Sequence, residues 1–197
     1  MIHTSVQSQT FLFSYTPVIY QEYLLVINPD AGVANDLSYT QKKAADMMGS
    51  PSRHTDTFIT VASFFANAEA EDQIAKDIKC SLKSKLRPSF IWLDNYGCNP
   101  ASGCIYIKSK PVAYLRAIQQ AIYPTLAISS AIEKSKKVNF VKEPHVVIAR
   151  TNRKKVAELW QQFKDKKYEN KFIVDSLYLL RKNVAEDTCE LVAEIKL

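Results

Sequence analysis

The sequence has little of several features that would place it in a specialised class. It contains four glycines, four cysteines and three histidines among 197 residues. No two cysteines form a CxxC pair, which argues against a zinc knuckle and favours free thiols. No run approaches the roughly 20 apolar residues of a membrane-spanning helix. The first residues lack a basic region and a small-residue cleavage site, so we expect no signal peptide and a cytoplasmic protein.

What is present is typical of one globular domain. The chain is 47% hydrophobic and 23% charged, and it is long enough to bury a core without metals or disulfides. Its net charge of +6 gives a modest attraction for phosphates. Three of the basic residues, Lys79, Lys83 and Arg87, have the spacing of one solvated helix face. We expect an N-terminal extension over residues 1–22 and one domain over 23–197.

Apolar periodicity predicts alternating strands and helices. Short runs rich in β-branched and aromatic residues predict strands, and apolar residues at helical spacing predict helices between them. Asp30 is the predicted N-cap and Gly49 the predicted C-cap of the first helix. Cys98 and Cys104 flank a predicted hairpin, where a disulfide is geometrically allowed but not required. The predicted strands are 23–28, 57–65, 89–94, 104–108, 144–150, 171–181 and 188–196.

The two halves of the chain, about 23–96 and 103–197, look like repeats. TFITVAS at 57–63 matches PHVVIAR at 144–150 position by position, and SFIWLD at 89–94 resembles KFIVDS at 171–176. A duplication usually places equivalent segments on either side of a pseudo-twofold axis. We therefore expect the Phe58 and His145 segments to face each other, with the candidate site between them.

These segments resemble the paired motifs of the 2H phosphoesterase superfamily, which includes the 2′-5′ RNA ligases and the 2′,3′-cyclic phosphodiesterases. TFITVAS is similar to the family's first motif and PHVVIAR to its second, each of the form His-apolar-Thr/Ser-apolar. The resemblance implies an α+β class: a duplicated two-lobed 2H phosphoesterase-like fold, with antiparallel-rich sheets forming a central cleft and helices outside. It also implies partners that carry a phosphodiester, namely RNA ends or small nucleotides, and neither a metal nor an organic cofactor.

Each motif departs from the family pattern at one polar position. The first has Phe58 in place of histidine but keeps Thr60, and the second keeps His145 but has Val147 in place of the hydroxyl residue. In a complete set, one imidazole accepts a proton and the other donates one, while the hydroxyls hold the phosphate. Phenylalanine cannot transfer a proton and valine cannot donate a hydrogen bond. The resemblance thus implies a catalytically impaired homologue that keeps a phosphate- or nucleotide-binding cleft with His145 and Thr60.

Arg150, His54 and His145 each have two interpretations. Arg150 matches the arginine that ends the family's second motif and is a candidate phosphate ligand, but strict alternation puts it on the face opposite His145. His54 is the candidate substitute for the missing histidine, yet four strand residues separate it from Phe58 by about 13 Å; otherwise it is a solvated loop residue. His145 lines the cleft, or it caps a strand through a backbone hydrogen bond.

Two other functions stay open at this point. One is an active 2′,3′-cyclic phosphodiesterase or RNA ligase in which His145 works with a non-standard partner, such as His54 or a tyrosine. The other is a structural or protein-interaction role with a vestigial cleft plugged by Phe58. Tyr96 and Tyr178 are candidates for stacking against a base in the cleft.

Overall fold

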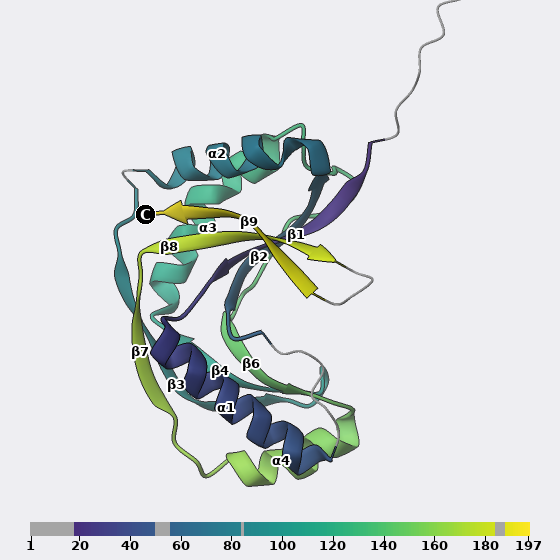
Figure 1. Ribbon diagram of the computed structural model, residues 1–197, viewed down its shortest axis with the longest axis vertical. Coiled ribbons are helices and arrows are strands. Elements are labelled where there is room, and N and C mark those ends of the chain that lie inside the picture. The colour runs from purple at the N-terminus through teal and green to yellow at the C-terminus, as the bar shows by residue number, and fades with distance from the viewer. Residues whose placement is uncertain (1–17, 50–55, 84, 184–187) are drawn as a thin grey trace, which may run out of the picture.

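Two antiparallel sheets with helices packed against them make up the fold (Figure 1). The structure is a computed structural model that describes residues 18–49, 56–83, 85–183 and 188–197. Over these residues the elements, in chain order, are β1 (Tyr20–Ile27), α1 (Ala31–Met48), β2 (Ile59–Asn67), the 3₁₀ turn η1 (Ala68–Ala70), α2 (Glu71–Leu82), β3 (Ser89–Asn99), β4 (Cys104–Lys110), α3 (Val112–Ile128), β5 (Asn139–Phe140), β6 (His145–Arg150), α4 (Arg153–Phe163), β7 (Glu169–Val174), β8 (Ser176–Asn183) and β9 (Thr188–Lys196).

Each sheet is assembled from both halves of the sequence. Sheet A has the strand order β5-β2-β1-β8-β9, and sheet B has the order β6-β4-β3-β7. β3 leaves the first half of the chain to pair with β4 and β7 in sheet B. β8 returns from the second half to pair with β1 and β9 in sheet A. The two lobes therefore exchange one central strand in each direction.

This exchange corrects two of our expectations for the second half. The predicted strand 171–181 is two strands, β7 and β8, which break at Asp175, where the chain passes from sheet B to sheet A. The sequence marks this break only by the polar pair Asp175–Ser176 between two otherwise apolar runs. Since β3 and β8 each pair with the first strand of the other half, the topology makes β8 the counterpart of β3. SFIWLD lies in β3, whereas KFIVDS lies mostly in β7. The similarity of these two sequences therefore does not identify structurally equivalent strands.

The first helix begins and ends at the predicted residues. The Asp30 side chain accepts a hydrogen bond of 3.0 Å from the Val33 amide, and Gly49 adopts the left-handed conformation with φ of 61°. Both caps are thus confirmed, since each satisfies backbone groups that a helix end leaves unpaired. α2 ends at Leu82, before Lys83 and Arg87, which we expected on one helix face, and β1 starts at Tyr20, inside the predicted N-terminal extension.

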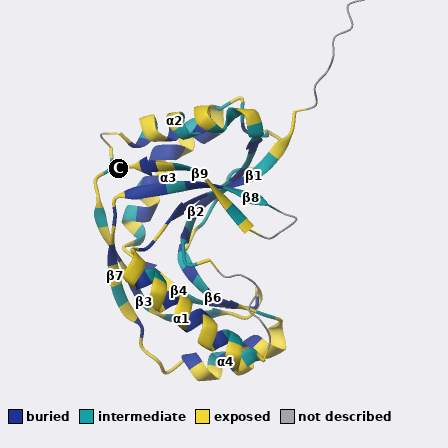
Figure 2. Ribbon diagram, in the orientation of Figure 1, coloured by how far each residue is buried: buried dark blue, intermediate teal, exposed yellow. Residues whose placement is uncertain are grey.

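The core lies between each sheet and its two helices. α2 and α3 contact strands of sheet A, whereas α1 and α4 contact strands of sheet B. Alternate residues of the strands, such as Ile91, Ile105 and Ile107 in sheet B, are buried. Figure 2 shows buried residues in dark blue along the strands and exposed residues in yellow on the helices. We call the face of sheet B that carries the exposed residues Phe90 and Trp92 its open face. No helix in the described ranges combines the length and apolar character needed to cross a membrane.

Candidate functional site

The two predicted motif segments have the same local structure. Each forms a strand, β2 or β6, that pairs with the first strand of its own half. Each carries a β-bulge at the same motif position: the register skips Val61 in β2 and Ile148 in β6. In both strands the bulged residue and the one after it are buried together. This shared irregularity supports the position-by-position match inferred from the sequence.

The bulge decides which face Arg150 occupies. Strict alternation would put Arg150 opposite His145, but one extra residue in a strand reverses the alternation beyond it. Because Ile148 is that extra residue, Arg150 returns to the face that carries His145 and Val147. His145 and Arg150 accordingly line the same pocket. The positive charge of Arg150 also lowers the pKa of neighbouring Cys104, although burial dominates and leaves that pKa raised overall.

The pocket has a volume of about 360 Å³ and lies on the open face of sheet B. Two cationic side chains, Lys142 and Arg150, and one anionic side chain, Glu143, contribute to its wall. This surplus of positive charge suits an anion. Residues from the β3–β4 hairpin, β4, β6 and the segment before β6 line it: Asn99, Ser102, Cys104, Tyr106, Val141, Lys142, Glu143, His145 and Arg150.

The tautomer of His145 follows from its contacts. Nδ1 lies 2.6 Å from the backbone carbonyl oxygen of Glu143. A carbonyl oxygen can only accept, so Nδ1 carries the proton and donates it, which leaves Nε2 to accept or donate a proton. The buried Ser109 hydroxyl fixes the preceding residue by donating to the Pro144 carbonyl at 2.5 Å. The ring thus makes the backbone hydrogen bond of the second interpretation and also lines this pocket, which contains no residue of the Phe58 segment. A place for His145 in a cleft between the two motif segments stays a prediction.

Tyr106 packs against His145 but does not offer it a hydroxyl. The two ring centroids are 4.5 Å apart. The far end of the Tyr106 ring lies over Gly97, where an added Cβ would come 2.9 Å from the hydroxyl oxygen. Gly97 is on β3 and His145 on β6, on opposite sides of β4, so the hydroxyl points away from the imidazole. Burial is the main cause that raises the pKa of Tyr106.

The remaining predicted site residues lie elsewhere. Thr60 is half-buried on β2, in one cross-strand row with Val26 and Tyr178 of sheet A, and it does not line the pocket. Phe58 is half-buried just before β2 begins. His54 falls outside the described residues. Site roles for Thr60, Phe58 and His54 therefore stay predictions.

Tyr96 cannot stack against a base in this pocket. Its ring packs edge-on against Phe163 of α4, with centroids 4.9 Å apart, and against Tyr168. The β3 bulge at Asn95, where φ is 58°, turns Tyr96 toward the helices and places Gly97 on the open face instead. The sequence does not specify this bulge, which is why Tyr96 looked like a candidate.

Sequence reasoning missed most of the pocket wall, including Tyr106 and Lys142. Tyr106 lies beside Val147 in the ladder, and only the register of β4 against β6 brings it to His145. Lys142 belongs to the basic run KSKKVNFVK at 134–142, whose composition is typical of a solvated surface. Cys98 and Cys104 are free thiols in the structure, and Cys104 contributes to the pocket wall. Within the described ranges no three His, Cys, Asp or Glu side chains gather closely enough to hold a metal ion.

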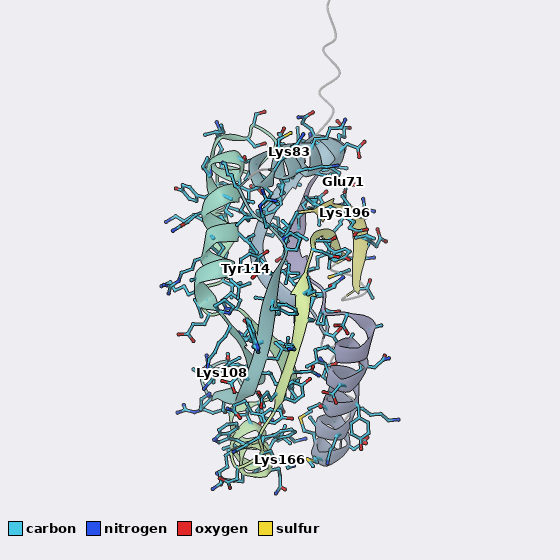
Figure 3. All side chains as sticks on the ribbon, turned by 90° about the vertical axis from the view of Figure 1, so that its left-hand side faces the viewer. Glu71, Lys83, Lys108, Tyr114, Lys166 and Lys196 are labelled. Atoms are coloured by element: carbon cyan, nitrogen blue, oxygen red, sulfur yellow. The ribbon has the colours of Figure 1, made fainter. Side chains whose placement is uncertain are left out.

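A second pocket, of about 380 Å³, lies at the other end of the molecule. It is lined by Leu86, Pro88 and Leu197 and by four cations, Lys79, Lys83, Arg87 and Lys196; Figure 3 shows Lys83 and Lys196 at that end. Arg87 reaches it from beyond the end of α2 rather than from the helix face we expected. Since neither motif segment and no histidine contributes to its wall, the His145 pocket is the better candidate for the site.

Comparisons with known proteins identify the family and the fold of this chain. The family described as the 2′-5′ RNA ligase superfamily matches residues 43–186. A search of curated protein sequences gave no match. Among solved structures, the chain is similar to E. coli LigT complexed with 3′-AMP, with a TM-score of 0.65 and 14% identity over 91% of this chain and 99% of that one.

Two further LigT structures are similar to the same degree. They are the complex with ATP, with a TM-score of 0.63 and 12% identity over 91% and 99% of the two chains, and the complex with phosphate, with 0.61 and 13% over 90% and 98%. At these identities the likeness shows the fold alone, and it confirms the predicted two-lobed α+β class. Because the family match spans most of the chain, this protein belongs to the 2′-5′ RNA ligase superfamily, a branch of the 2H phosphoesterases.

Proposed function

We propose that this protein binds a phosphate-bearing nucleotide or RNA end in the His145 pocket and is catalytically impaired. One observation carries the proposal: His145 is held with its Nε2 available in a cationic pocket, while the equivalent position of the other motif strand is Phe58. The relatives support the choice of ligand, since LigT has been crystallised with 3′-AMP, ATP and phosphate.

Binding and catalysis make different demands on these residues. Binding an anion needs convergent donors and open volume, and Arg150, Lys142 and the His145 ring can supply both. Phosphodiester transfer needs a proton acceptor and a proton donor, and each positioned group contributes about 10²- to 10⁴-fold. With Phe58 in one of the two positions, a loss of this order is expected. The open pocket also favours a binding role over a vestigial, filled cleft.

Binding is tested by calorimetric titration of the whole protein with 3′-AMP. Arg150→Ala should weaken binding roughly 10- to 100-fold, because a hydrogen bond to a charged group contributes about 1.5–3 kcal/mol. Arg116→Ala, which removes an equal charge from an exposed position on α3, is the matched control and should leave the affinity unchanged. Equal affinities for all three proteins would refute the proposed pocket.

Catalysis is tested by hydrolysis of a 2′,3′-cyclic nucleotide. The wild type should show no turnover above background, and the Phe58→His, Val147→Thr double variant should show some, because it restores both motif positions. Turnover by the wild type that His145→Ala abolishes would contradict the proposed impairment. It would instead favour an active enzyme in which His145 works with another group, and His54→Ala would then test that partner.

A further inference from the structure

The open face of sheet B carries exposed aromatic residues outside the pocket. Phe90 and Trp92 on β3 are 42% and 43% exposed, and Ile173 on β7 is 52% exposed. The residues on either side of Trp92 in its strand, Ile91 and Leu93, are fully buried, so this exposure belongs to one face. We name this surface the platform; it consists of Phe90, Trp92, Lys110, Lys171 and Ile173.

Lysines surround the aromatic rings of the platform. Trp92 lies directly between Lys110 on β4 and Lys171 on β7 in the sheet register. The Lys171 ammonium is 5.5 Å from the centroid of the Phe90 ring, and no ion pair with a described carboxylate is found for it. Lys110 forms an ion pair of 2.6 Å with Asp94 on the same face. The platform therefore alternates aromatic faces with cations.

The platform and the His145 pocket share one sheet face. His145 is paired with Lys108, and Lys108 with Asp94, so these three side chains form one row. Trp92 and Lys110 form the parallel row two residues further along. Strand spacings put Trp92 about 12 Å from His145. Figure 3 shows Lys108 on the opposite side of the strands from α1, as this face requires.

This combination fits a single-stranded nucleic acid better than a protein partner. Aromatic side chains stack on any base, and neighbouring cations neutralise the backbone phosphates. The cores of protein–protein interfaces, in contrast, are depleted in lysine. The Phe90 and Trp92 rings are 6.0 Å apart and inclined by 48°, so they present two separate faces to successive bases. The exposed lysines of the platform and the spacing of about 12 Å between Trp92 and His145 both suit a nucleic-acid strand whose end lies near His145.

We propose that the platform binds the bases of a single-stranded RNA whose terminal phosphate occupies the His145 pocket. This inference rests on the proposed function, because the pocket supplies the phosphate site from which the strand extends. Trp92 and Phe90 stack with bases, and Lys171 contacts the backbone. The platform thus adds contacts to nucleotides beyond the one whose phosphate lies in the pocket.

The test compares 3′-AMP with a single-stranded hexa-adenylate that ends in a 3′-phosphate. Trp92→Ala should weaken binding of the hexanucleotide roughly 5- to 150-fold, the range for loss of one stacked base, and leave the affinity for 3′-AMP unchanged. Trp92→Phe should retain most of the affinity because it keeps an aromatic face. Tyr39→Ala, which removes an aromatic ring 67% exposed on α1, is the control and should have no effect.

A second measurement reports on Trp92 directly. The chain has two tryptophans, so Trp160→Phe leaves Trp92 as the single tryptophan, whose emission can be excited selectively over that of the tyrosines. Its emission should be quenched by the hexanucleotide and not by inorganic phosphate. Absence of quenching, or an unchanged hexanucleotide affinity in Trp92→Ala, would overturn the inference even if 3′-AMP binds through Arg150. Hexanucleotide binding that requires Trp92 but not Arg150 would support the platform and refute the pocket as the phosphate site.

Discussion

Gly97 is predicted to set the position of the Tyr106 ring, and its replacement tests how the pocket is built. A Cβ at residue 97 would come 2.5 Å and 2.6 Å from the Tyr106 ring carbons Cζ and Cε2, whereas ordinary contact begins at 3.4 Å. The ring would have to move, and it packs on His145 at 4.5 Å. Overpacking of this kind typically costs about 1–3 kcal/mol.

A double-mutant cycle isolates this contact. Without the Tyr106 ring, Gly97→Ala should stabilise the protein by about 0.5–1 kcal/mol, because alanine loses less conformational entropy than glycine in a strand. In the wild type the same change should lower the free energy of unfolding by about 1–2 kcal/mol. Gly97→Ala and Tyr106→Ala should therefore be coupled by about 1.5–3 kcal/mol.

The assay is urea denaturation of the four proteins followed by far-UV circular dichroism, with 3′-AMP affinity measured in parallel. Gly97→Ala should also weaken 3′-AMP binding, since a displaced Tyr106 ring disturbs His145. Equal costs of Gly97→Ala in the presence and absence of the Tyr106 ring would refute the reasoning, because the clash is then not with that ring.

Two further predictions concern stability. The buried Gln41 amide donates to the Val147 carbonyl at 2.9 Å, so Gln41→Leu should lower the free energy of unfolding by about 1–3 kcal/mol. Urea denaturation measures this loss, with Gln120→Leu at an exposed position as the control. An equal loss in both variants would contradict the prediction. Burial and a hydrogen bond to Glu71 raise the pKa of Tyr23 above its ordinary 10.0. The unfolded chain loses that proton first, so stability should fall as pH rises above about 10, and the fall should be smaller in Tyr23→Phe if Tyr23 contributes to it.

Local signals predicted the motif strands and the caps of α1. Asp30 and Gly49 act within one turn of the chain, so a single sequence is enough to place them. The match of Phe58 with His145 rests on period-two alternation within two short strands. The structure supports the match through equivalent bulges at Val61 and Ile148. The side-chain pattern of the sequence does not predict these bulges.

Features that depend on pairing between distant strands could not be predicted. The face of Arg150 is decided by the bulge at Ile148, and the contact of Tyr106 with His145 is decided by the register of β4. The break between β7 and β8 follows from the two sheets that they join, since the runs on either side of Asp175 and Ser176 are similarly apolar. Register and crossover are properties of the assembled sheets rather than of local sequence.

The exchange of β3 and β8 makes the two lobes one folding unit. Each of these strands is central in the sheet of the opposite half, flanked on both sides. A fragment covering either half of the chain would lack the inner strand that the other half supplies, and the first-half fragment would carry β3 without its partners in sheet B. Such fragments should aggregate rather than fold, and the intact chain should unfold in a single transition. The same linkage keeps the two motif strands, β2 and β6, in a fixed relation, with no hinge between independent lobes.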